Sequence, residues 1–158
     1  METMLDGRFQ ASIAGSILVP IFQFLYGEGD LTLYIMLALA VFIALDWLSG
    51  SSAAKKDGSY GSDYGIDGIK RTFFMVILPV GGNFIDQALG IPSVFFGLLA
   101  GGLLYHTINS ATANAIRAGW GRWIPESALN LLMNWVKSEL ESKAKRSLDR
   151  KKEKGKED

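Results

Sequence analysis

The chain has 158 residues, enough for one domain, and its 16 Lys plus Arg balance its 16 Asp plus Glu, so the formal net charge is zero. Zero net charge gives no overall basic field and argues against a general nucleic-acid binder. The absence of cysteine excludes a disulfide framework, a thiol nucleophile and a Cys-based metal site, and a single histidine cannot form a multi-His zinc site.

Long uncharged segments divide the chain and indicate an all-α integral membrane protein. Residues 9–26, 72–85 and 87–105 have no charged side chain, and residues 31–49 have only Asp46. A helix needs about 20 mostly apolar residues to cross a bilayer. The pattern therefore predicts four membrane spans, at about 9–26, 31–49, 72–89 and 92–108.

Proline and glycine are expected to shape the last two spans. Pro79, followed by Gly81 and Gly82, predicts a kink in the third span. Pro92 is a favourable first residue for the fourth helix. Its uncharged pattern continues to Ile116, so this helix is expected to extend beyond the bilayer.

The first span has two alternative interpretations, a cleaved signal peptide or a helix that lies in the interface. A signal peptide should begin with bases and end at a small-x-small cleavage site. Glu2 and Asp6 precede the span with only Arg8 as a base, and no such cleavage site follows. A membrane span is therefore preferred.

The Lys and Arg counts of the short loops predict that both termini lie in the cytoplasm. The connections at 27–30 and 89–92 have no base, whereas the loop predicted at 50–71 has four, namely Lys55, Lys56, Lys70 and Arg71. The predicted organisation is a cytoplasmic amino terminus at 1–8, a membrane domain at 9–118 and a cytoplasmic carboxyl region at 119–158.

The carboxyl region begins with the glycine- and tryptophan-rich segment 119–123, which suits the headgroup zone. Pro125 then opens a predicted amphipathic helix whose apolar positions recur at helical spacing: Leu129, Leu132, Val136, Leu140, Ala144 and Leu148. Residues 137–158 form a charged tail. It is either a solvated extension or, together with the helix, an interfacial, self-associating element that regulates assembly electrostatically.

Small residues predict helix-packing faces on two spans. Ser93, Gly97 and Gly101 recur every four residues on the fourth span, and Ala11 and Gly15 form a weaker face on the first. Small residues at this spacing let two helix backbones approach closely in lipid. The partner is either another helix of the same chain or a second copy.

Two carboxylates, Asp46 and Asp86, fall at membrane depth. Because they lie near opposite membrane faces, they are poorly placed to form one catalytic pair. His106, where the fourth span leaves the membrane, is interpreted as an interfacial polar residue. The sequence contains no nucleophile elbow, P-loop or dinucleotide fingerprint. We therefore predict neither an enzyme nor a cofactor or metal site.

The segment after the second span carries the most informative pattern. Asp46, Gly50 and Ala54 share one helix face, and Asp57-Gly58 has turn chemistry. This pattern resembles the signature of the phage lysis and toxin-secretion holins. That signature consists of D-x3-G-x3-A, then a short basic turn that ends in Gly, and then a Ser, a Gly and a basic residue. The matching residues are Asp46, Gly50, Ala54, Gly58, Ser62, Gly68 and Arg71.

The resemblance covers about residues 31–136. It continues weakly into Gly121-Arg122-Trp123-Ile124-Pro125, which is similar to the family's G-x-x-[IV]-P before its carboxyl helix. Between these two motifs the chain departs from the family pattern. The family's acidic and asparagine residues after the last span are replaced by Asn109, Ser110, Thr112 and Asn114.

The resemblance implies a multi-pass protein of the bacterial host's cytoplasmic membrane that self-associates among membrane lipids into large pores. These pores would release an endolysin or export a toxin. Polar residues of the first and third spans could line the water once the helices rearrange: Ser12, Ser16, Gln23, Asn83, Asp86 and Gln87. The alternative classes are a small selective channel or transporter and a structural membrane subunit. A transporter should show paired half-repeats with a charged midplane site, and a selective channel a repeated filter motif; the sequence has neither.

Overall fold

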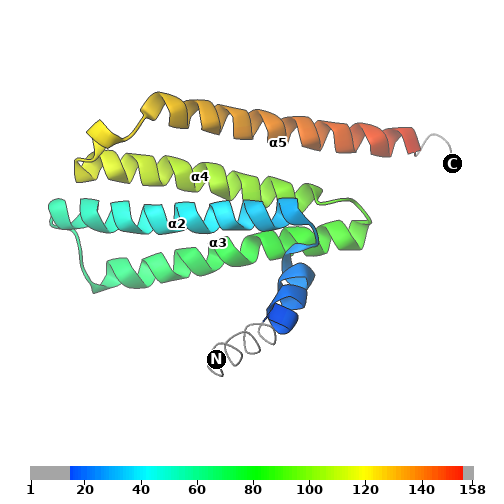
Figure 1. Cartoon of the computed structure of the whole chain (residues 1–158), viewed down its shortest axis with the longest axis horizontal. Helices are drawn as coiled ribbons and strands as arrows, with labels where there is room; N and C mark the ends of the chain where they lie inside the picture. The colour runs from blue at the N-terminus through cyan, green and yellow to red at the C-terminus, as the bar shows by residue number, and fades with distance from the viewer. Residues whose placement is uncertain (1–14, 155–158) are drawn as a thin grey trace, which may run out of the picture.

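The computed structural model describes residues 15–154, and within this range all regular elements are helices, without a strand (Figure 1). A short apolar helix at Gly15–Tyr26 leads into the longer elements. These are α2 (Asp30–Lys56), α3 (Ser62–Leu89), α4 (Val94–Ala118), the 3-10 turn η1 (Gly121–Trp123) and α5 (Glu126–Lys154).

Three of these helices, α2, α3 and α4, are long and apolar enough to cross a membrane. They correspond to the predicted second, third and fourth spans. The described part of the amino-terminal helix, Gly15–Tyr26, is shorter. Residues 9–14 of the predicted first span, including Ala11 and Ser12, lie outside the described residues. The first span, and with it the total of four spans, remains a prediction.

The expected loop at 50–71 is mostly helical, which corrects the predicted boundaries. Helix α2 continues to Lys56 and α3 already begins at Ser62, so only residues 57–61 connect them. The Ser, Ala and Lys residues at 51–56 are compatible with a helix, so α2 can continue through them. Contacts between α2 and α3, described below, stabilise the glycine-containing start of α3. The fourth-span helix starts at Val94 rather than Pro92, because Ser93 adopts a left-handed conformation with φ of 49°.

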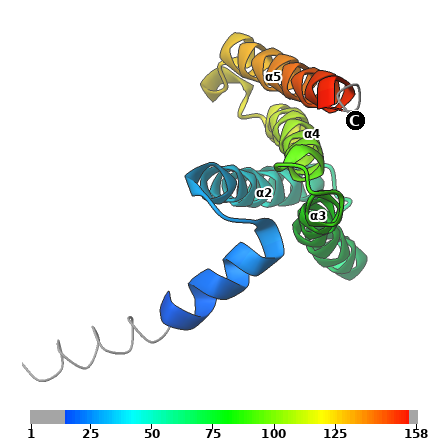
Figure 2. The same ribbon diagram turned by 90° about the vertical axis from the view of Figure 1, so that its right-hand side faces the viewer.

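Helix α4 is the centre of the bundle. It contacts α2, α3 and α5, and in the end-on view it lies between α5 and the α2–α3 pair (Figure 2). One apolar cluster joins Tyr26, Val80, Phe96 and Ala100, and a second joins Leu39, Ile43 and Met75. The amino-terminal helix leaves this bundle at a steep angle beside the start of α2 (Figure 2).

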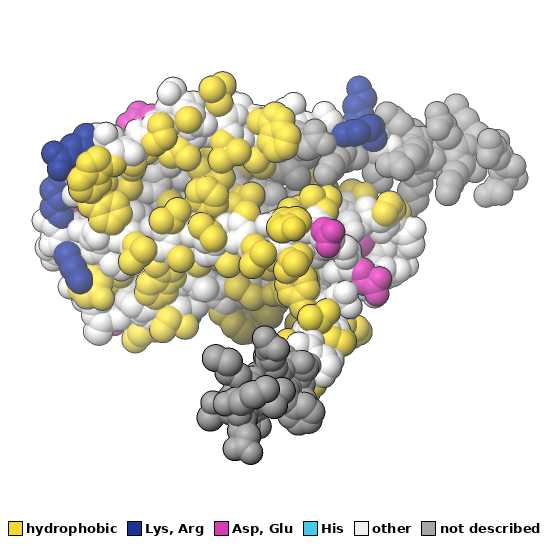
Figure 3. Space-filling model, in the orientation of Figure 1, with side chains coloured by type: hydrophobic (Ala, Val, Ile, Leu, Met, Phe, Trp, Pro, Cys, Tyr) yellow, Lys and Arg dark blue, Asp and Glu magenta, His cyan; other side chains and the backbone are white. Residues whose placement is uncertain are grey.

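The outside of the three spans is apolar. Leu37, Val41, Phe73, Phe74 and Ile77 each expose between 48% and 67% of their surface. Apolar side chains cover the visible face of the spans, and Lys and Arg gather at the end where α2 meets α3 (Figure 3). An apolar band with basic residues at one end is the surface expected of a membrane-embedded bundle.

Helix α5 runs back alongside α4 (Figures 1 and 2). Met133 is the buried apolar residue of its amino-terminal half, whereas Leu131 and Trp135 expose 71% and 65% of their surface. From the predicted apolar stripe, Leu129 and Val136 are half-buried, and Leu132 is 38% exposed. The side chains of Leu140, Ala144 and Leu148 lie outside the described set.

Candidate functional site

A buried carboxylate links the three spans at the basic end of the bundle. Asp46 of α2 is only 2% exposed. Its Oδ2 accepts a hydrogen bond from Arg71 Nη2 of α3 at 2.7 Å, and its Oδ1 accepts one from Asn114 Nδ2 of α4 at 3.0 Å. A buried charge is tolerated when it is both paired and hydrogen-bonded. We call these three residues the Asp46 clasp.

A surface network extends the Asp46 clasp toward the turn after α2. Asn114 Oδ1 accepts a hydrogen bond from Arg117 Nη1 at 3.1 Å. Arg117 Nη2 lies 2.6 Å from Asp57 Oδ2, and Lys56 Nζ donates to the Arg117 carbonyl at 3.0 Å. The end of α2 is therefore fastened to the end of α4 by residues that are partly exposed to solvent.

Two glycines beside the clasp leave room for aromatic side chains that reach between α2 and α3. A Cβ at Gly50 would lie 2.5 Å from the Tyr64 hydroxyl, and one at Gly68 would lie 2.8 Å from the Trp47 ring. Trp47 Nε1 also donates to Thr72 Oγ1 at 2.8 Å. Replacing either glycine requires a neighbouring side chain to move, so both positions favour glycine for packing reasons.

The other predicted motif residues shape the hairpin. Ala54 is 2% exposed. Gly58 has φ of +73°, a conformation that favours glycine, and it completes the turn predicted at Asp57-Gly58. Ser62 is the exposed first residue of α3. The structure thus brings Asp46, Gly50, Gly68 and Arg71 together and places the remaining motif residues along the same hairpin.

A second polar cluster lies at the opposite end of the bundle. Asn83 Nδ2 donates to the carbonyls of Phe24 and Leu25 at 3.2 and 3.0 Å, which satisfies the end of the amino-terminal helix. Asp86 is 3% exposed and accepts from the backbone N–H groups of Phe95 and Phe96 at 2.9 and 2.8 Å. Asp86 therefore caps the positive end of α4.

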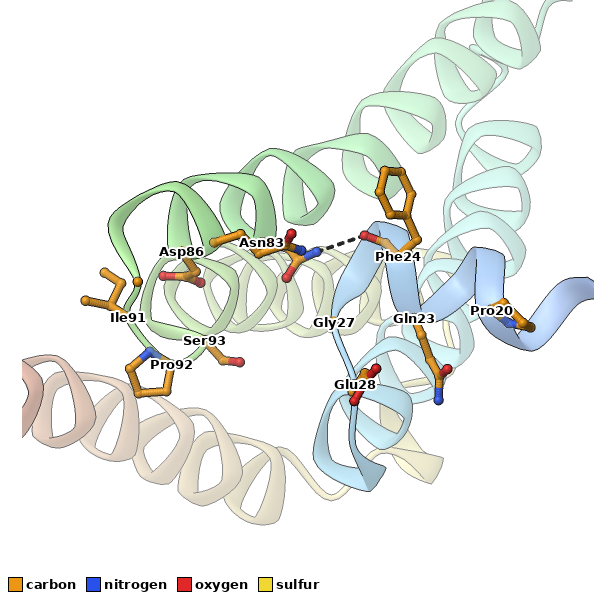
Figure 4. A pocket seen from close by; sticks show the side chains of 12 residues that line it. Pro20, Gln23, Phe24, Gly27, Glu28, Asn83, Asp86, Ile91, Pro92 and Ser93 are labelled. Atoms are coloured by element: carbon orange, nitrogen blue, oxygen red, sulfur yellow. Dashed lines mark hydrogen bonds between the residues drawn. The ribbon is translucent and has the colours of Figure 1, made fainter.

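These residues border a cleft of about 770 Å³ between the amino-terminal helix and the α3–α4 turn (Figure 4). Four of the predicted pore-lining residues meet there, namely Gln23, Asn83, Asp86 and Gln87. Ser16 is exposed on the amino-terminal helix and does not line this cleft. Asp46 and Asp86 each have their own partners at opposite ends of the bundle.

The predicted packing face on the fourth span divides into two parts. Gly101 is buried inside the chain, whereas a Cβ at Gly97 would meet no atom within 4 Å. Ser93 is exposed in the turn before α4. A Cβ at Gly15 would also meet nothing within 4 Å. His106 is exposed near the middle of α4. Its interfacial position remains a prediction.

Sequence reasoning missed the residues that complete these contacts. Asn114 was noted only as a departure from the family pattern. Asn109, Ser110 and Thr112 lie on the same part of α4, so polarity alone does not distinguish Asn114 from them. Gly82 allows the backbones of α3 and α4 to approach closely, because a Cβ there would lie 2.8 Å from the Phe96 nitrogen. Nothing in the sequence distinguishes Gly82 from Gly81.

Comparison with known proteins identifies the class. The family model described as the bacteriophage holin family matches residues 21–144. The chain belongs to the bacteriophage holin family. The match includes α2, α3, α4 and both polar clusters, and this holin-family chain is accordingly a multi-pass membrane protein. No curated protein and no solved structure matches it.

Proposed function

We propose that this holin-family protein oligomerises in the bacterial cytoplasmic membrane and opens non-selective pores that time host lysis. The pores release an endolysin or export a toxin. The family match over the whole three-span bundle carries this proposal. Its partners are other copies of the chain and membrane lipids, with an endolysin or toxin as the functional partner. It acts without catalysis, cofactor, metal or nucleic acid.

The resting protein is suited to accumulate in lipid without opening a pore. Large apolar side chains cover much of its outer surface, and its buried polar side-chain atoms have hydrogen-bond partners throughout the described residues. In hydrocarbon, polar groups must be satisfied inside the protein. A closed bundle of this kind supports a long harmless phase before assembly.

Assembly requires contacts between copies and polar surface for the pore. The open side of Gly97 leaves room for the backbone of a second α4. The polar cleft gathers Gln23, Asn83 and Gln87 beside the amino-terminal helix. Gly27 and Gly29, which connect this helix to α2, both have positive φ. Rotation of the helix at these glycines would expose the polar cleft residues to water in the assembled pore.

The proposal includes a four-span topology with both termini in the cytoplasm. The basic end of the bundle, where the Asp46 clasp lies, faces the cytoplasm. The acidic connection containing Glu28 and Asp30 faces outward.

Controlled expression tests the proposal. Induction should leave culture density and membrane potential unchanged for a delay, after which the potential collapses abruptly. When a wall hydrolase is co-expressed, lysis should follow the collapse. Gradual, ion-selective leakage from the start of induction would instead indicate a selective channel or transporter, and no effect on potential would indicate a structural membrane subunit.

A further inference from the structure

A small pocket opens between α2 and α3 beside the Asp46 clasp. It has a volume of about 190 Å³ and is lined by Trp47, Tyr64, Asp67, Gly68 and Arg71. The close packing at Gly68 holds the Trp47 ring on one side of it. The pocket thus joins two charged side chains of opposite sign with two aromatic rings.

Arg71 retains hydrogen-bonding capacity after its pairing with Asp46. Only Nη2 has an acceptor among the described residues, and the side chain is 42% exposed. A guanidinium has five N–H donors in a planar fork that matches a phosphate group. The same side chain can therefore hold Asp46 and bind an anionic oxygen from the pocket.

Asp67 places a carboxylate on the rim of the same pocket. Its side chain is 74% exposed, and Oδ1 accepts from the surface residue Lys70 at 3.3 Å. Exposed ion pairs of this type are weak, so an incoming ammonium group can compete with Lys70. The pocket therefore complements a ligand that has both a phosphate and an amine.

The position of the pocket indicates that this ligand is a lipid. Arg71 immediately precedes the uncharged segment 72–85, and the next residues, Phe73 and Phe74, are 67% and 61% exposed. Half-buried Trp and Tyr rings are typical of the headgroup level of a bilayer. Basic pockets between spans on the cytoplasmic side are suited to lipid headgroups.

We propose that the pocket between α2 and α3 binds a phospholipid with an ethanolamine-type headgroup. Arg71 binds its phosphate, Asp67 binds its primary ammonium, and its acyl chains follow the apolar surface beside Phe73. The bound lipid would bridge the two helices next to the Asp46 clasp. This ligand site is independent of whether the chain forms a pore.

Native mass spectrometry of the full chain in detergent tests the site. The protein is titrated with dioleoyl-phosphatidylethanolamine, dioleoyl-phosphatidylglycerol or the soluble headgroup phosphoethanolamine, and retained ligand is counted. The variants are Asp67→Asn and Arg71→Lys, the latter keeping a cation for Asp46. Asp63→Asn is the matched control, because Asp63 is an exposed acid one turn earlier on α3 and does not line the pocket.

The wild type and Asp63→Asn should prefer the ethanolamine lipid to the glycerol lipid by about three- to fivefold, the size of a partly solvated charge contact. Asp67→Asn should lose this preference, and Arg71→Lys should weaken the retention of both lipids. Equal retention of both lipids by the wild type, or equal preference in Asp67→Asn and Asp63→Asn, contradicts the site. Phosphoethanolamine binding as tightly as the lipid would overturn the assignment to a lipid.

Discussion

The substitutions Arg71→Gln and Asp46→Asn, which each remove one member of the Asp46–Arg71 pair, should destabilise the bundle by different amounts. Arg71→Gln leaves the Asp46 carboxylate, 2% exposed, with Asn114 as its remaining side-chain donor. Breaking a buried pair in this way costs about 3–5 kcal/mol. We expect the lower end of that range, because Arg71 is 42% exposed and water can enter from its side.

Asp46→Asn should cost less, about 1–2 kcal/mol. The amide oxygen can still accept from Asn114, and the released Arg71 can be solvated at the surface. The double variant should be more stable than the sum of the two single losses predicts, because it contains no unpaired buried charge. The positive coupling should be about 1–2 kcal/mol.

Thermal unfolding in detergent, followed by far-ultraviolet circular dichroism, measures the four stabilities of this cycle. Asp57→Asn is the matched control, since its pair with Arg117 has similar chemistry but is 42% and 54% exposed. The free energy of unfolding of that control should fall by less than about 1 kcal/mol. The decrease should be smaller in high salt. Additive losses for Asp46→Asn and Arg71→Gln would refute the Asp46 clasp as a coupled unit.

Three further predictions concern assembly, timing and topology. Gly97→Leu should delay or abolish lysis while membrane insertion stays normal. Gly102→Leu, at an equally open glycine on another side of α4, should lyse on schedule. If Gly97→Leu also lyses on schedule, Gly97 faces lipid and not a second copy. Truncation after Leu140 removes most of the basic tail and should advance lysis at equal expression, because crowded like-charged tails repel one another; unchanged timing would identify the tail as a solvated extension. In this cysteine-free chain, single cysteines at Gly29, Lys56 and near the carboxyl terminus should react with an impermeant thiol reagent only at position 29; labelling of position 56 in intact cells contradicts the topology.

The local parts of the fold were predictable because they depend on composition and turn chemistry. The apolar runs located α2, α3 and α4, and the Asp57-Gly58 turn lies where the sequence predicts it. Asp46 and Gly50 also share one face of α2, since both lie against Asn114. Helix boundaries were less predictable, because the start of α3 depends on packing against α2 rather than on the propensity of its glycine-rich sequence.

Contacts between distant segments were not predictable from a single sequence. Asn114 is 68 residues from Asp46, and no local pattern couples the two. Asp86 was predicted as a pore-lining residue, and the contact of its carboxylate with the start of α4 was not predicted. A cap normally comes from the residue just before the helix, and here the turn brings an earlier acid to that position.

The passage of a protein through the membrane tests the central claim most directly. Cells expressing the chain together with a cytoplasmic endolysin are followed for membrane potential and for endolysin activity outside the cytoplasmic membrane. The proposed holin function predicts that the potential is constant during the delay and that its collapse coincides with the appearance of endolysin outside. Loss of potential with the endolysin retained in the cytoplasm would contradict the formation of large, non-selective pores.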